Sequence, residues 1–80
     1  MALEQCLKTL DDIITQPSEY DEWWKASTNG LQAGRDAFAK GERNKDMLRY
    51  IMETAYRNCG GLYEQGWDAF MDTFFDITDL

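Results

Sequence analysis

The sequence predicts an all-α fold, a compact bundle of about four helices that forms one domain over residues 1–80. Apolar residues recur at spacings of three and four through most of the chain, which is the period of one helix face. No stretch of useful length alternates apolar and polar residues with the period of two that marks a β-strand. Short connections separate the periodic segments, so neighbouring helices are expected to pack antiparallel or at steep angles. The predicted helices cover roughly residues 2–15, 17–40, 44–58 and 62–77.

The first predicted helix, 2–15, ends where Pro17 follows Gln16, because a residue that precedes proline is driven out of the helical conformation. Pro17 can in turn open the second helix, since a proline at the first helical position gives up no hydrogen bond. The apolar face of the first helix consists of Leu3, Cys6, Leu7, Leu10, Ile13 and Ile14.

The continuity of the second predicted helix, 17–40, depends on Asn29-Gly30. This dipeptide is typical of a turn, but the apolar phase runs through it without a break, so we expect one long helix with a weak point there. Gly30, Gly34 and Ala37 would then let another helix approach closely, and Gly41 ends the segment. The residues that keep one phase are Tyr20, Trp24, Ser27, Leu31, Gly34 and Phe38.

The third and fourth predicted helices have clear ends. Asn44 is a suitable N-cap for the third, and Gly60-Gly61 allows the left-handed backbone that closes it. The apolar face of the third helix consists of Met47, Leu48, Ile51, Met52, Ala55, Tyr56 and Cys59, and that of the fourth of Leu62, Tyr63, Gly66, Trp67, Phe70, Met71, Phe74 and Ile77. Because methionine fills irregular gaps in a core, Met47, Met52 and Met71 are expected to be buried.

The residue types of an active site are missing from the chain. It has no histidine, the commonest general base and metal ligand, and it has no glycine-rich phosphate loop or dinucleotide motif. Cys6 and Cys59 are too few for a zinc site. They could form a disulfide, but their places on apolar helix faces favour reduced, buried thiols. We therefore expect no enzyme activity, no cofactor and no metal.

Targeting features are also missing. No apolar run approaches the roughly 18–20 residues that a membrane span requires, and the first residues lack the basic and apolar regions of a signal peptide. We expect a cytoplasmic protein.

The net charge of −7 is distributed as acid, base, acid along the chain. Residues 1–24 carry six acids against one base, which gives −5, and residues 25–57 carry seven bases against four acids, which gives +3. Residues 58–80 carry five acids and no base, which gives −5 again. Acidic ends of this strength would repel phosphates, so we expect no direct binding of nucleic acid.

The last five acids form the most unusual pattern in the sequence. Glu64, Asp68, Asp72 and Asp76 recur every four residues, and Asp79 extends the series. On a helix each step rises about 6 Å and turns about 40°, so these side chains form a slowly winding acidic ribbon. Like charges four residues apart destabilise a helix, and aspartate is a mediocre helix former. A helix selected for stability alone would more often alternate Glu with Lys.

Three interpretations of the acidic ribbon are open. It can be the solvated face of an amphipathic helix, it can pair with basic residues of the same chain, or it can bind a basic surface on another protein. B-DNA presents one charge about every 3.4 Å along each strand, so the ribbon matches a duplex only loosely but could still compete for a groove of Lys and Arg. The basic residues available within the chain are Lys40, Arg43, Lys45 and Arg49.

The start of the second helix offers further candidates for partner binding. Glu19, Asp21 and Glu22 lie in its first turn, where the helix dipole favours acids. Trp23 and Trp24 lie about 100° apart on a helix, so Trp24 fits the apolar face while Trp23 lies nearer its edge. Burial of Trp23 is expected, with exposure as an interface anchor as the alternative.

No motif of a named family occurs in these residues. In size, charge and helical content alone, the chain is similar to small phage-encoded inhibitors of host nucleic-acid machinery, including anti-CRISPR and anti-restriction proteins, some of which are DNA mimics. The resemblance implies an inhibitor or modulator that docks on a basic, nucleic-acid-binding protein. Two alternatives remain: a structural module such as a helical homodimer or complex subunit, and a small regulatory DNA-binding protein that uses Arg43, Lys45 and Arg49.

Overall fold

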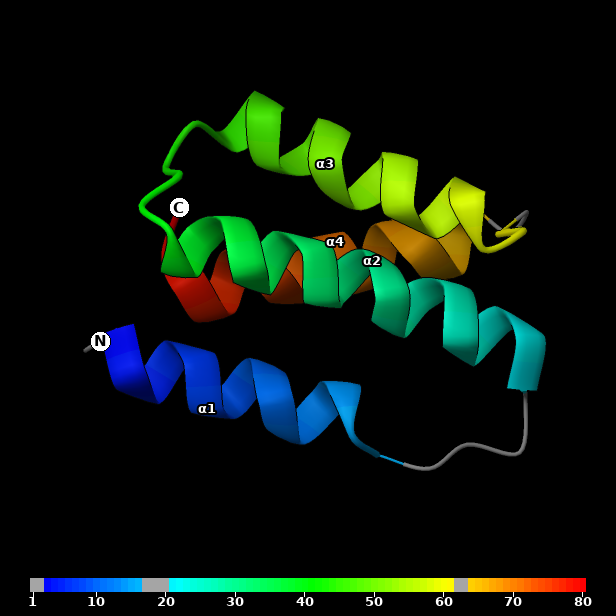
Figure 1. Cartoon of the computed structure of the whole chain (residues 1–80), viewed down its shortest axis with the longest axis horizontal. Coiled ribbons are helices and arrows are strands. Elements are labelled where there is room, and N and C mark those ends of the chain that lie inside the picture. The colour runs from blue at the N-terminus through cyan, green and yellow to red at the C-terminus, as the bar shows by residue number, and fades with distance from the viewer. Residues whose placement is uncertain (1–2, 17–20, 62–63) are drawn as a thin grey trace.

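The computed structural model describes residues 3–16, 21–61 and 64–80, and it confirms the all-α prediction (Figure 1). All regular secondary structure in these residues is helical. The side chains of residues 21, 22, 64 and 65 are not described, although their backbone is. The four helices are α1 (Leu3–Ile14), α2 (Asp21–Ala39), α3 (Lys45–Asn58) and α4 (Glu64–Thr78).

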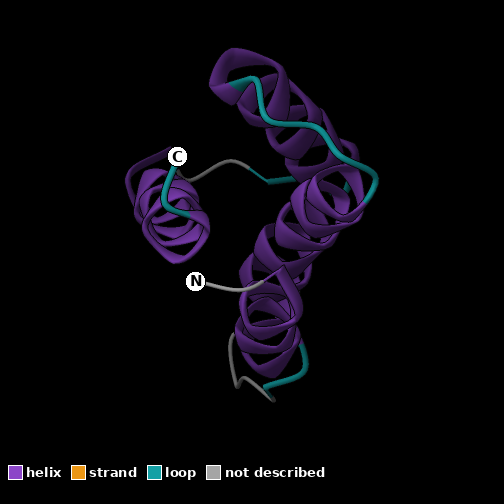
Figure 2. Cartoon of the chain, turned by 90° about the vertical axis from the view of Figure 1, so that its left-hand side faces the viewer, coloured by secondary structure: helices purple, strands orange, loops and turns teal. Residues whose placement is uncertain are grey.

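Three helices form a curved layer, and the fourth packs against one face of it. Consecutive helices run antiparallel, with α2 between α1 and α3 (Figure 1). Figure 2 shows α4, which leads to the C-terminus, standing apart from this layer. Because α2 contacts each of the other helices, it is the centre of the fold.

The ends of α2 and α3 and the start of α3 follow the predicted signals, whereas the predicted opening of the second helix at Pro17 lies outside the described residues. The Asn44 side chain caps α3 by accepting a hydrogen bond from the backbone N–H of Met47 at 3.0 Å. Gly41 (φ 110°) and Gly60 (φ 82°) have the left-handed backbone that ends α2 and α3. No helix in the described part of the chain is both long enough and apolar enough to cross a membrane.

Helix α2 continues through Asn29-Gly30 without a break, as expected from its apolar phase. Glycine is needed there because the neighbouring helices come close: a Cβ at Gly30 would overlap the Trp67 indole, and one at Gly34 would lie 2.5 Å from Met52 Sδ. The Asn29 side chain donates a hydrogen bond to the carbonyl of Ala55 at 2.9 Å and so links α2 to α3. Packing against α3 and α4 thus outweighs the turn preference of the dipeptide.

Large side chains fill the space between α3 and α4. Tyr56 and Trp67 stack with their ring centroids 4.4 Å apart and their planes nearly parallel. Burying such flat apolar surfaces contributes strongly to the stability of a small domain. The buried hydrophobic residues are Cys6, Leu10, Ala26, Leu31, Phe38, Leu48, Met52, Tyr56, Trp67, Met71, Phe74 and Phe75.

The methionine prediction is right for two residues and wrong for one. Met52 and Met71 are buried, but the side chain of Met47 is 48% exposed. Met47 lies in the first turn of α3, on the flank turned away from α4. Its spacing placed it on the apolar face of the third helix. Spacing along one helix does not reveal which flank a neighbouring helix leaves uncovered.

The cysteine prediction is also right in part. Both thiols are free, so no disulfide forms, and Cys6 is buried with its Sγ 3.4 Å from the carbonyl of Ile77. Cys59 is exposed, which corrects its expected place in the core. It follows the last residue of α3 as the C-cap, with φ −96° and ψ 15°, so it no longer keeps the helical phase.

Candidate acidic docking surface

The acidic ribbon lies on the solvent side of α4. Asp68, Asp72 and Asp76 are all exposed, while the neighbouring face of the helix buries Trp67 and Phe74 in the core. The three carboxylates therefore project outward at intervals of about 6 Å along the axis. Only the backbone of Glu64 is described, so the place of its carboxylate lies outside the described residues.

Asp79 extends the acidic surface but does not continue the helical series. It follows the end of α4 in a turn with φ 57°, where its backbone N–H donates to the carbonyl of Asp76 at 3.4 Å. Its side chain is exposed. The turn, rather than the four-residue period, sets its position relative to the other aspartates.

The aspartates of the ribbon are not neutralised within the part of the chain that the structure describes. None of Asp68, Asp72, Asp76 and Asp79 forms an ion pair or a side-chain hydrogen bond there. The structure therefore gives no support to the interpretation in which these acids pair with the basic residues of the same chain, which are Lys40, Arg43, Lys45 and Arg49.

Three of these four bases, Arg43, Lys45 and Arg49, contact aromatic rings instead. The guanidinium of Arg43 lies 3.8 Å from the centroid of the Phe38 ring and donates to the Phe38 carbonyl at 2.7 Å. Lys45 Nζ and the Arg49 guanidinium lie 5.0 and 5.5 Å from the centroid of the Phe75 ring. Cations attract the electron-rich face of a ring at such distances, so Lys45 and Arg49 are held along the α3 side of α4, while Arg43 is held on α2.

Phe75 was missing from the apolar face expected for the last helix, yet it is only 5% exposed. It lies at the edge of that face, between the core residue Met71 and the acidic side. Lys45 and Arg49 reach across from α3 and cover it. The only sequence signal for its burial is its aromatic character next to Phe74.

A polar depression of about 310 Å³ lies between α3 and α4, beside the ribbon. Three of its lining residues are acids and one is a base, so its net charge is negative. Carboxylates of this kind can accept charge-assisted hydrogen bonds from an arginine or lysine, and the apolar stem of such a side chain can pack on a thioether. The lining residues are Arg49, Glu53, Asp68, Met71 and Asp72.

The structure does not bring Trp23 into this acidic surface. Trp23 is half-buried and packs edge-to-face on Phe70 with centroids 5.3 Å apart, and a Cβ at Gly66 would lie 2.7 Å from its Cζ2. Phe70 and Asp68 are two residues apart and so lie about 160° apart around α4. Trp23 is thus on the opposite flank of α4 from the depression, and its role as an anchor stays a prediction.

The predicted acids near the start of α2 lie outside what can be described. Glu19 falls in the segment that the structure does not describe, and only the backbone of Asp21 and Glu22 is described, in the first turn of α2. Whether these acids join the acidic surface therefore stays a prediction.

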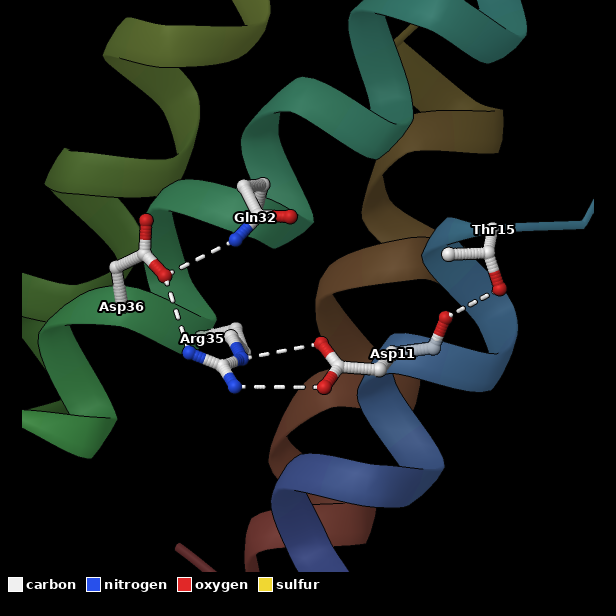
Figure 3. A network of polar contacts seen from close by, with 5 residues as sticks. All are labelled: Asp11, Thr15, Gln32, Arg35 and Asp36. Atoms are coloured by element: carbon white, nitrogen blue, oxygen red, sulfur yellow. Dashed lines mark hydrogen bonds and ion pairs between the residues drawn. The ribbon is translucent and has the colours of Figure 1, made fainter.

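A second group of acids, at the junction of α1 and α2, is paired (Figure 3). Arg35 donates from Nε and Nη2 to the two carboxylate oxygens of Asp11, at 3.0 and 3.3 Å, and from Nη1 to Asp36 at 3.3 Å. Gln32 also donates to Asp36, at 3.0 Å, and the Thr15 hydroxyl donates to the backbone carbonyl of Asp11 at 2.8 Å. The hydrogen bond to Asp11 is the largest of the effects that raise the pKa of Arg35 above its ordinary value. The network links α1 to α2, and we interpret it as structural.

No group of three or more Cys, Asp or Glu side chains within the described ranges is placed to hold a metal ion. Comparison of the chain with protein-family models, with curated proteins and with solved structures finds no significant match.

Proposed function

We propose that this protein is a non-enzymatic, cytoplasmic inhibitor or modulator that docks the acidic ribbon of α4 on a basic surface of a nucleic-acid-binding protein. The observation that carries the proposal is the exposure of Asp68, Asp72 and Asp76 without a basic partner in the described part of the chain. A basic protein would supply the missing partners. In this proposal the ribbon acts as a partial mimic of a nucleic-acid backbone, like the phage inhibitors that the chain resembles.

Repulsion between the acids of α4 supports a role in binding a partner rather than in stabilising the fold. Each like-charged pair four residues apart costs the helix about 0.2–0.5 kcal/mol, and α4 carries four acids and no base. The attraction between these acids and the Lys and Arg residues of a partner would offset this repulsion. The field of the exposed carboxylates would also speed its association.

The neighbouring depression adds specificity to the charge. Its wall combines carboxylates of Asp68 and Asp72 with the buried thioether of Met71. This combination suits a long basic side chain, whose stem can pack on Met71 while its cationic group reaches a carboxylate. We expect an arginine or lysine of the partner to enter here.

Direct binding of nucleic acid is not part of the proposal. Arg43, Lys45 and Arg49 would be the contacts, but Lys45 and Arg49 lie on Phe75, next to the acids of α4. Those acids would repel a phosphate backbone. An electrophoretic mobility shift with duplex DNA and with RNA should show no complex, and tight binding lost on substitution of the three bases would contradict the proposal.

The decisive experiment compares three baits in parallel captures from the host organism: the wild type, a ribbon variant (D68N, D72N and D76N) and a control variant (E4Q, D12N and E42Q). Both variants neutralise three acids and so carry the same net charge of −4, against −7 for the wild type. Glutamine at 42 keeps an oxygen for the hydrogen bonds that Glu42 accepts from the backbone N–H of Arg43 and Asn44.

Mass spectrometry should identify basic nucleic-acid-binding proteins that the wild type and the control variant retain and the ribbon variant loses. Equal capture of these proteins by the ribbon variant, with its fold verified by circular dichroism, would eliminate the proposal. Equal loss in both variants would also contradict it, because net charge rather than the ribbon would then govern binding.

A further inference from the structure

Asn29-Gly30 is the one Asn-Gly pair in the chain, and it lies in the middle of α2 rather than in the turn for which it is typical. In such a pair the backbone nitrogen of the glycine can attack the side-chain carbonyl carbon of the asparagine, because glycine carries no Cβ to block the approach. This attack is the first step of spontaneous deamidation. The pair is therefore a candidate modification site, and it takes no part in the acidic surface.

Deamidation of this pair needs only water and involves no oxidation or reduction. A bond forms between the Gly30 nitrogen and Asn29 Cγ, the bond from Cγ to Nδ2 breaks, and the amide nitrogen leaves as ammonia with the proton of the Gly30 N–H. Water then opens the resulting imide. Hydrolysis at the side-chain carbonyl gives aspartate, and hydrolysis at the main-chain carbonyl of residue 29 gives isoaspartate. Either product adds one negative charge to the chain.

Burial does not protect the Asn29 amide. Its side chain is exposed, so water reaches it, although Gly30 itself is buried. The backbone nitrogen of Gly30 lies within a continuous helix, where each N–H is engaged by the carbonyl four residues earlier. The geometry of the two groups, rather than the exclusion of water, therefore decides whether they react.

Two features of the fold hold the pair in an unreactive geometry. The imide ring closes only from a non-helical value of ψ at the asparagine, and Asn29 lies inside α2. In addition, Asn29 Nδ2 donates to the carbonyl of Ala55 at 2.9 Å, which directs the amide toward α3 and away from its own main chain. Both the helical backbone and this hydrogen bond have to be lost before the Gly30 nitrogen can reach Cγ.

The packing around Gly30 would also prevent a deamidated chain from regaining the native fold. Isoaspartate adds one atom to the main chain and so shifts the helix next to Gly30. There is no room for such a shift, because even a Cβ at Gly30 would overlap the Trp67 indole and lie 3.0 Å from the Met52 carbonyl oxygen. Aspartate keeps the length of the chain but places a carboxylate, with no proton to donate, against the Ala55 carbonyl.

We propose that Asn29-Gly30 is a deamidation site that the native fold suppresses, so that its deamidation permanently marks molecules that have unfolded. Helix α2 contacts each of the other helices, so it cannot open while the rest of the domain stays folded. The unfolded fraction of a small domain is low under native conditions, which keeps the reaction slow. The proposal is independent of the proposed function, since neither residue belongs to the acidic ribbon.

Peptide mapping by mass spectrometry tests the suppression with the purified wild type, held in mildly alkaline buffer over a series of guanidinium chloride concentrations. Circular dichroism of the same samples gives the unfolded fraction. Deamidation of Asn29 should be at least about tenfold slower without denaturant than in the unfolded chain, and it should rise in proportion to the unfolded fraction. Asn44 and Asn58 are internal controls, because the residues after them carry a Cβ, and they should react more slowly than Asn29 in the unfolded chain.

The stability of the two products tests whether the mark is permanent. The isoaspartyl chain, separated from unreacted chain by anion exchange, should not recover the native circular dichroism after removal of the denaturant, whereas the unreacted chain should. N29D reproduces the aspartate product and should melt at a lower temperature than the wild type. Q5E adds the same charge at an exposed position of α1 and should not lower the melting temperature.

Three outcomes would overturn the proposal. Deamidation of Asn29 as fast without denaturant as in the unfolded chain would show that the fold gives no protection. A rate below the unfolding transition that exceeds what the unfolded fraction allows would show that the reaction does not require unfolding. An isoaspartyl chain that regains the native circular dichroism and melting temperature would show that the change leaves no permanent mark.

Discussion

The junction of α1 and α2 and the outer face of α4 both carry aspartates, but only those at the junction form ion pairs with a base among the described residues. At the junction, Asp11 and Asp36 share the guanidinium of Arg35 in a network of short hydrogen bonds. On α4, Asp72 and its neighbours in the ribbon face solvent without a base among the described residues. The number of acids in a region is therefore a poor guide to their role, and whether a base pairs with them is a better one.

This contrast has a physical basis in the placement of the bases. Arg35 lies on the flank of α2 that faces α1, so its guanidinium contacts the carboxylate of Asp11 there. Lys45 and Arg49 do face α4, yet they lie over the Phe75 ring and form no ion pair with Asp68 or Asp72. Acids that stay unpaired beside available bases are free to bind another molecule.

The largest expected effect separates binding from stability. Replacement of Asp68, Asp72 and Asp76 by Asn should lower the association rate with a purified basic partner about tenfold, with a shallower salt dependence, because long-range attraction acts mainly on association. The melting temperature should stay constant or rise, because like-charge pairs are removed.

The matched comparison is D11A, which should leave the association rate unchanged and lower the melting temperature. Surface plasmon resonance at several salt concentrations, together with thermal denaturation followed by circular dichroism, measures both quantities. If the ribbon variant lost stability and D11A lost affinity for the partner, the assignment of binding to the ribbon and of stability to the α1–α2 junction would be wrong.

A smaller effect on stability is expected when one aspartate in each region is replaced by lysine. D72K places a base four residues from both Asp68 and Asp76, and each new pair should stabilise α4 by about 0.2–0.5 kcal/mol. D11K places a base against Arg35 and should destabilise the protein. Urea denaturation of the two variants should therefore shift the midpoint in opposite directions, and shifts of the same sign would show that the two regions do not differ.

The smallest effect is a response to salt. R35M removes the pairs to Asp11 and Asp36 and should lower the melting temperature by a few degrees in dilute buffer, because exposed ion pairs contribute little. The difference from the wild type should narrow in 1 M NaCl, where the screening length falls to about 3 Å. A difference that persists unchanged would mean that Arg35 stabilises the junction by packing rather than by charge.

The sequence was sufficient for features that depend on one helix at a time. The three- and four-residue periods located four helices, and the phase that runs through Asn29-Gly30 predicted an unbroken α2. The same periodicity placed Asp68, Asp72 and Asp76 outside the apolar face of α4. Each of these features is decided by spacing along a single helix, which the sequence contains.

Features that depend on how helices meet were not predictable in the same way. The pair between Arg35 and Asp11 joins residues 24 positions apart, and no local pattern marks it. The burial of Phe75 and the exposure of Met47 depend on which flank of a helix another helix covers. The depression beside α4 needs α3 and α4 to be placed first.

The contact of Gly30 with Trp67 restricts which pairs of side chains the two positions can carry together. The indole occupies the volume that a Cβ at residue 30 would need, and its other surroundings include the Tyr56 ring stacked at 4.4 Å, so it has little room to retreat. A side chain can therefore appear at position 30 only together with a smaller residue at 67. In homologous chains the two positions should covary, with tryptophan at 67 restricted to chains that keep glycine at 30.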